Sequence, residues 1–179
     1  MDELTRLALK ARDGDRTAFA AFVRRSQSEV WRFVASLVGS TDADDVTQDA
    51  YVRAWRSIAR YRGDASARTW MFVIARRACA DSLRSRTRRS RLARRLEDAA
   101  TTGSIIGPDP SGGHALEALV EQLSGERREA FVLTQLFGLS YEESAAVCGV
   151  PVGTIRSRIA RARGDLIDAV RRADETGTG

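Results

Sequence analysis

Apolar residues recur along most of this 179-residue chain at intervals of three or four positions, the spacing of amphipathic α-helices. One such stripe follows Asp15, a residue suited to capping a helix N-terminus, and Gly39 and Ser40 end it. Its members are Phe19, Phe22, Val23, Val30, Trp31, Val34 and Leu37. A second helix is predicted from Asp42 to about Arg60, and its stripe consists of Val46, Ala50, Ala54 and Ile58.

A third helix is predicted to begin near Ser66 and to continue into an arginine-rich run. No segment of five or more residues alternates apolar and polar positions, so we predict no strands. The composition changes at residues 97–114, which hold two of the three prolines and four glycines and carry no helical stripe. We therefore predict a linker at this point of the chain.

Shorter helices are predicted beyond this linker. The first carries Leu116, Leu119, Val120 and Leu123, and the next follows Ser124 and stops at Gly138. Ser140 and Glu143 have the spacing of a capping box, and Pro151 is suited to the first turn of the last helix.

The predicted fold is therefore all-α, with two small helical domains at residues 1–96 and 115–173. The first has three to four helices and the second contains a helix-turn-helix. A flexible linker at 97–114 joins them, and a tail follows at 174–179.

The composition is that of a globular chain, with 43% hydrophobic and 30% charged residues. No apolar stretch is long enough to cross a membrane and the N-terminus lacks a secretory signal, so we expect a cytoplasmic protein with no membrane insertion. The chain has one histidine, and Cys79 and Cys148 lack metal-site spacing. We therefore expect no enzyme activity, no catalytic residues, no metal and no cofactor.

Positive charge is concentrated in residues 76–95, which contain nine arginines and one aspartate. Such a run attracts polyanions, and the nearby aromatics Tyr61, Trp70 and Phe72 are candidates for stacking on unpaired bases. The alternative is that these aromatics belong to the core and that the basic run is a solvated tail.

Residues 141–165 have the pattern of a helix-turn-helix, with Ala145, Gly149, Val150 and Ile155 at the positions that lock two crossing helices together. We expect its second helix to offer Thr154, Arg156, Ser157, Arg158, Arg161 and Arg163 to solvent, where they could reach the major groove and its phosphates. An ordinary helical hairpin with a basic face is the alternative.

Three segments resemble the bacterial sigma factors of RNA polymerase, in the order found in that family, and cover most of the chain outside the linker. Residues 44–55 resemble the helix that binds core polymerase, and residues 61–76 resemble the promoter-melting and minus-ten segment. Residues 139–158 are similar to the helix-turn-helix that reads the minus-thirty-five element. The two-domain layout resembles the extracytoplasmic-function group.

The resemblance implies a role for particular residues. The polymerase-binding positions are Asp45, Gln48, Asp49, Arg53 and Trp55. The minus-ten positions are Tyr61, Arg62, Asp64, Arg68, Thr69, Trp70, Arg76, Arg77 and Arg84. The minus-thirty-five positions are Thr154, Arg156, Ser157, Arg158 and Arg161. Many relatives carry Asn where Arg77 stands, and because Arg offers only donors, its base preference is expected to differ.

The implied function is to bind core RNA polymerase and direct initiation at specific promoters, by reading the minus-thirty-five duplex and capturing the melted minus-ten non-template strand. The expected partners are core polymerase, promoter DNA and a separate anti-sigma factor. One alternative is a stand-alone helix-turn-helix regulator, which would bind its duplex without polymerase. A second is an RNA-binding or structural helical protein, which would bind RNA without promoter preference.

Overall fold

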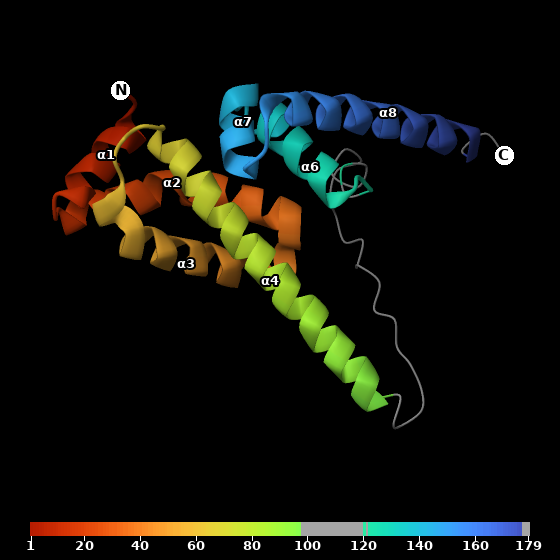
Figure 1. Cartoon of the computed structure of the whole chain (residues 1–179), viewed down its shortest axis with the longest axis horizontal. Coiled ribbons are helices and arrows are strands. Elements are labelled where there is room, and N and C mark those ends of the chain that lie inside the picture. Colours follow the sequence, from red (N-terminus) through yellow and green to blue (C-terminus); the bar gives the residue numbers. More distant parts are fainter. Residues whose placement is uncertain (98–119, 121, 177–179) are drawn as a thin grey trace.

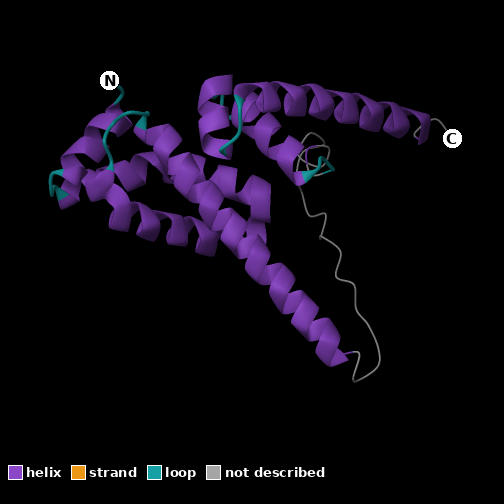
Figure 2. Cartoon of the chain, in the orientation of Figure 1, coloured by secondary structure: helices purple, strands orange, loops and turns teal. Residues whose placement is uncertain are grey.

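The computed structural model describes the backbone of residues 1–97, 120 and 122–176, and side chains are described outside 91–97 and 173–176. Every regular element in these residues is a helix (Figures 1 and 2). The α-helices are α1 (Glu3–Arg12), α2 (Arg16–Val38), α3 (Ser40–Ser57), α4 (Ala67–Glu97), α6 (Gly125–Phe131), α7 (Tyr141–Cys148) and α8 (Val152–Thr176). A short 3-10 helix, η1 (Ile58–Arg60), follows α3, and a π-helix, η2 (Val132–Leu136), follows α6. The all-α prediction is confirmed.

The helix ends mostly follow the predicted signals. The Asp15 side chain accepts from the amide of Ala18 and caps α2, and Gly39 ends that helix. Ser140 and Glu143 form a complete capping box on α7. Helix α1 was not predicted, although Asp2 caps it by accepting from the amide of Thr5.

Helices α1 to α4, with η1, form the N-terminal domain. Helix α2 packs against α1 and α3, and α4 crosses the group and continues well beyond it (Figure 1). The centre of this domain is aromatic: the Phe33 and Phe72 rings meet edge to face with centroids 4.8 Å apart, and Phe22 and Met71 are fully buried. Such edge-to-face pairs add to the stabilisation that burial alone provides.

Helices α6, α7 and α8, with η2, form the C-terminal domain. Helices α7 and α8 make the predicted helix-turn-helix, with Gly149 in the left-handed conformation that the tight turn requires (φ +67°). Ile155 and Ile159 of α8 are buried beneath this turn. The helix expected around Leu116 and Leu119 lies outside the described residues, as do residues 98–114 of the predicted linker.

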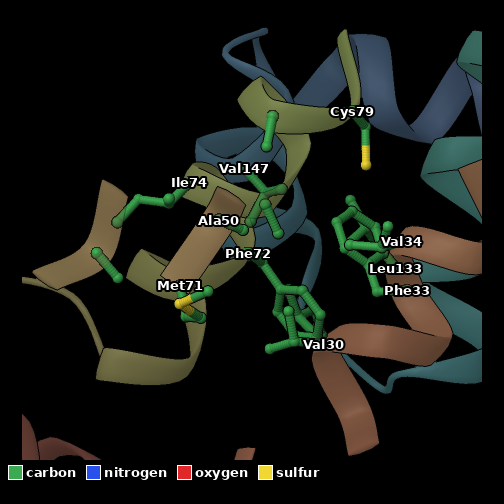
Figure 3. Packing of buried hydrophobic residues seen from close by; sticks show 14 of the residues in the cluster. Val30, Phe33, Val34, Ala50, Met71, Phe72, Ile74, Cys79, Leu133 and Val147 are labelled. Carbon is green, nitrogen blue, oxygen red and sulfur yellow. The ribbon is translucent and has the colours of Figure 1, made fainter. Parts of the chain in front are cut away.

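The two domains pack directly against each other and share one hydrophobic core. Figure 3 shows Leu133 and Val147 of the C-terminal domain in the same cluster as Phe33 and Phe72 of the N-terminal domain. Phe137, which follows the π-helix, places its ring 5.9 Å from that of Phe33 and 5.4 Å from that of Phe72, between centroids. In the described part of the chain, no helix is long and apolar enough to span a membrane.

Candidate functional site

Helix α3 presents a mixed acidic and apolar face to solvent. Asp45, Gln48 and Asp49 are exposed along it, as the sequence predicted. The Trp55 side chain is 42% exposed and the Val52 side chain 40% exposed, although Trp55 also leans on the Phe19 ring at a centroid distance of 4.8 Å. Val52 was missed by sequence reasoning because it was counted with neither the stripe nor the polar face. Exposed apolar groups beside carboxylates are typical of a protein-binding surface.

Arg53 is the exception on this face, because it is held by two carboxylates. Its guanidinium lies 2.8 Å from Asp49 in the preceding turn and 2.5 Å from Asp81 on α4. The hydrogen bond to Asp81, then that to Asp49, raises the pKa of Arg53, and the same contact lowers the pKa of Asp81. Arg53 therefore joins α3 to α4 as well as bordering the exposed face.

Residues 61–66 form the loop that connects η1 to α4. The hydroxyl of Tyr61 donates to the carbonyl oxygen of Ala65 at 2.6 Å, and its ring is buried against that of Trp70. Burial raises the pKa of the Tyr61 hydroxyl, and its interaction with Thr5 opposes the rise. Arg62 and Asp64, by contrast, form an exposed ion pair at 2.9 Å.

The expectation that Tyr61 and Phe72 could stack on unpaired bases is wrong. Both rings are buried within the core, and Trp70 is half-buried between Tyr61 and Phe22. The aromatic spacing along residues 61–72 therefore serves packing in this structure. The polar residues of the loop, and not these rings, are the part of the segment that faces solvent.

The first turns of α4 are covered by polar groups of the C-terminal domain. Arg68 donates to both carboxylate oxygens of Glu29 on α2 and to the backbone carbonyl of Phe137. The hydroxyl of Thr69 donates to Glu143 of α7 at 3.2 Å. The sequence-predicted minus-ten residues Arg68 and Thr69 are thus occupied by contacts within the chain.

Arg76, two turns further along α4, also contacts the C-terminal domain. It forms an ion pair with Glu129, a buried carboxylate of α6. Desolvation is the largest single influence and lowers the pKa of Arg76, but the hydrogen bond to Glu129 and the nearby negative charges together outweigh it, so the net pKa is raised. Arg77, the next residue, is exposed, and Arg84 is exposed while pairing with Asp81.

Both cysteines lie near this buried ion pair. Burial, followed by the charge of Glu129, raises the pKa of the Cys79 and Cys148 thiols to about 12 each. At neutral pH both thiols are therefore protonated and poorly nucleophilic. Within the described residues, no group of three or more His, Cys, Asp or Glu side chains is arranged to hold a metal ion.

The second helix of the helix-turn-helix presents only part of its predicted basic face. Arg156, Ser157 and Arg161 are exposed, and Thr154 is half-buried. The expectation that Arg158 is offered to solvent is wrong: its side chain is 14% exposed and lies 2.8 Å from Glu126 of α6. Arg158 is thus directed back onto its own domain.

Sequence reasoning missed the residues that join the two domains, namely Glu129, Phe137 and Glu143. Their partners on α4 are 53 to 74 residues away in the chain. A glutamate or phenylalanine on an otherwise ordinary helix carries no local signal of such a distant partner.

The comparisons with known proteins agree with this two-domain division. Residues 22–89 match the model of sigma-70 region 2, and residues 113–166 match that of sigma-70 region 4. The ECF RNA polymerase sigma factor SigC of Mycobacterium tuberculosis is 44% identical over 182 aligned residues, which cover 98% of this chain and 96% of that protein. The ECF RNA polymerase sigma-E factor of Escherichia coli is 34% identical and covers 88% of each chain.

Two solved structures superpose on most of this chain. CnrH, solved in complex with the cytosolic domain of CnrY, superposes with a TM-score of 0.71 at 31% identity and covers 97% of this chain and 99% of its own. The sigma factor RpoE of Bartonella quintana, solved with the anti-sigma factor NepR, gives a TM-score of 0.69 at 29% identity and covers 86% of this chain and 96% of its own.

Proposed function

Because this chain belongs to the sigma-70 family of RNA polymerase sigma factors, in its extracytoplasmic-function group, we propose which of its residues carry out each step of that function. A sigma factor binds core RNA polymerase and directs it to specific promoters, and the similarity of whole-length relatives is the observation that carries this conclusion. It acts through binding free energy, so we assign no catalytic residue and no cofactor. Its place of action is the cytoplasm, where core polymerase works.

The exposed face of α3 is the proposed contact with core polymerase. Asp45, Gln48, Asp49 and Trp55 would touch the polymerase directly, and Val52 adds apolar area between them. Tryptophan is among the residues that contribute most to protein interfaces, and surrounding polar groups mainly exclude water. Arg53 would hold Asp49 in place and contact the polymerase at the border of this face.

The loop at residues 61–66 and the exposed face of α4 are the proposed site for the opened minus-ten strand. Arg62, Asp64, Arg77 and Arg84 are exposed and available to an incoming strand. Thr69 and Arg76 would join them once they are released from the C-terminal domain, and Arg68 would do so after also leaving Glu29 on α2. Tyr61 and Trp70 would not contact the strand, but their packed rings would support the loop.

We propose that the two domains separate before DNA is bound. While they pack against each other, the C-terminal domain contacts Arg68, Thr69 and Arg76 and keeps them from DNA. Reading two promoter elements about one and a half to two helical turns apart requires a separation of ~50–70 Å. The 18-residue linker spans at most ~60–65 Å when extended. We propose that core polymerase draws the domains apart, so that promoter binding depends on polymerase.

The function is tested by run-off transcription with core enzyme on a library of promoters. We expect core polymerase to start at defined promoters only when this protein is present, and we expect the protein alone to show negligible specific binding to those promoters. Specific duplex binding without polymerase, together with unchanged start sites, would instead support a stand-alone regulator.

The minus-thirty-five contact is predicted to depend on Arg156 and not on Arg158. We expect Arg156→Ala to weaken binding of the holoenzyme to its promoter duplex by about 1–3 kcal/mol, because an exposed arginine at this position can bond two acceptors of a guanine. Arg158→Ala should instead lower the thermal stability of the protein, since it removes the partner of Glu126.

The matched control is Arg171→Ala, which removes an exposed arginine near the other end of the same helix. Footprinting at a constant salt concentration separates the three variants. An unchanged minus-thirty-five footprint for Arg156→Ala would reject the assignment.

An anti-sigma factor is the remaining proposed partner. The two solved relatives were each captured with another protein, the cytosolic domain of CnrY in one case and the anti-sigma factor NepR in the other. We propose that a separate protein of this kind binds the present chain and competes with core polymerase for it.

A further inference from the structure

Helix α1 lies outside the segment that matches sigma-70 region 2, which begins at residue 22. It nevertheless carries a buried hydroxyl that reaches the start of α4, 62 residues later in the chain. The Thr5 hydroxyl accepts from the backbone amide of Ala67, the first residue of α4, at 3.0 Å. This contact is a helix cap supplied by a different helix, because the first amides of any helix lack partners within it.

The direction of the Thr5 hydroxyl is determined by a second contact. It donates its proton to the carboxylate of Asp2 at 2.6 Å, and this leaves its lone pairs for the amide of Ala67. Asp2 also accepts from the Thr5 amide at 2.9 Å. The same carboxylate therefore caps α1 and orients the Thr5 hydroxyl. Asp2, Thr5 and Ala67 therefore form one chain of hydrogen bonds from α1 to α4.

The loop between η1 and α4 also rests on α1. A side chain on Gly63, at the middle of the loop, would meet a methyl group of Leu9 at 3.5 Å, and the backbone of Gly63 is left-handed (φ +81°). Tyr61 packs beneath the loop and interacts with Thr5. The start, the middle and the end of the loop thus each have a neighbour on α1, whereas Arg62 and Asp64 project into solvent.

We propose that α1 positions the loop at residues 61–66 for capture of the minus-ten strand, with Thr5 as the positioning residue. This inference rests on the proposed role of that loop. Arg62 and Asp64 are highly exposed, and their ion pair is too weak to hold a loop in one place. Their direction is therefore determined by the backbone beneath them, and that backbone is held at the start of α4 by Thr5 and lies over Leu9 at Gly63.

Two substitutions of similar size separate this role from general stability. Thr5→Val keeps the shape of the side chain and removes the hydroxyl, whereas Thr5→Ser keeps the hydroxyl. The matched control is Thr47→Val, because the Thr47 hydroxyl is buried in the same domain and has no hydrogen-bond partner among the residues that the structure describes. Each variant is assembled with core polymerase and assayed on a promoter library randomised in the minus-ten element.

For Thr5→Val we expect promoter opening that is about five- to tenfold slower, the effect of losing one buried hydrogen bond, and a flattened base preference in the minus-ten element. Core binding and minus-thirty-five binding should match the wild type. Thr5→Ser should restore both the opening rate and the preference, and Thr47→Val should alter neither.

A purely structural role for Thr5 gives a different result. In that case Thr5→Val lowers the melting temperature while the folded fraction keeps the wild-type base preference and opening rate, and the proposal is overturned. If Thr5→Val does not fold, Leu9→Ala provides the same test, since it removes the methyl group that lies nearest to the side-chain position of Gly63 and leaves the hydrogen bonds in place. If the wild-type holoenzyme selects no promoter, the proposed function fails as well, and this outcome is distinct from a failure of Thr5 alone.

Discussion

Replacing Trp55 by Ala is expected to weaken assembly of this protein with core polymerase by about 2 kcal/mol, or roughly 30-fold. The indole is the largest exposed apolar group on α3, one turn after the exposed Val52, and the exposed Asp45 and Asp49 lie further back along the same helix. Large aromatic anchors of this kind carry most of the binding free energy of an interface, whereas exposed charges around them contribute less. Titration of labelled core enzyme measures the effect.

The control for Trp55→Ala is Leu83→Ala, which removes an exposed apolar side chain of similar accessibility from α4. Because the Trp55 ring also touches Phe19, the helical content and melting temperature of both variants are compared with those of the wild type. Wild-type affinity for core polymerase in a folded Trp55→Ala variant would show that the polymerase binds elsewhere.

Replacing Phe137 by Ala is expected to open the chain. Its ring packs against both Phe33 and Phe72, and the substitution removes these contacts between the domains while keeping the backbone carbonyl that accepts from Arg68. Truncation of a buried phenylalanine costs about 3–5 kcal/mol, and since Phe137 is only partly buried we expect the lower end of this range. The free protein should then bind a single-stranded minus-ten oligonucleotide at least about tenfold more tightly, because Thr69 and Arg76 are released and Arg68 loses its contact with the C-terminal domain.

The two thiols report the same opening independently of DNA. Cys79 and Cys148 are buried where the domains meet, and their pKa values of about 12 keep them protonated. In Phe137→Ala both should react faster with a thiol reagent. Phe131→Ala is the control, since it removes a ring of the same domain that makes no aromatic contact with the N-terminal domain among the described residues. Equal thiol reactivity in Phe137→Ala and wild type would contradict the proposed closure.

Much of the fold follows from local patterns that can be recognised in the sequence. The stripe from Phe19 to Leu37 and the capping box of Ser140 and Glu143 each depend on residues within one or two helical turns. Helix α1 was missed because its buried positions carry the small residues Thr5, Ala8 and Ala11 and no large apolar side chain, although Asp2 followed by Thr5 was a usable signal for its start. Short helices take most of their stability from packing against other elements, and the spacing of residues within the helix does not reveal those partners.

The candidate site was only partly predictable for a related reason. The exposed positions of α3 follow from the helical period, since the opposite face carries the buried stripe. The burial of Tyr61 and Phe72, and the pairing of Arg158 with Glu126, depend on which surfaces meet in three dimensions. An aromatic or an arginine has the same local pattern whether it serves the core, an ion pair or a nucleic acid.

The pairing of Arg68 and Arg76 with the C-terminal domain has an evolutionary consequence. If these two side chains both hold the domains together in the free protein and contact the promoter, a mutation that changes promoter contact also changes how firmly the domains pack. Selection for a new target sequence would then alter the latency of the free protein unless Glu129 or Phe137 changed in compensation. Divergence among such regulators should therefore proceed through paired substitutions that span the two halves of the chain.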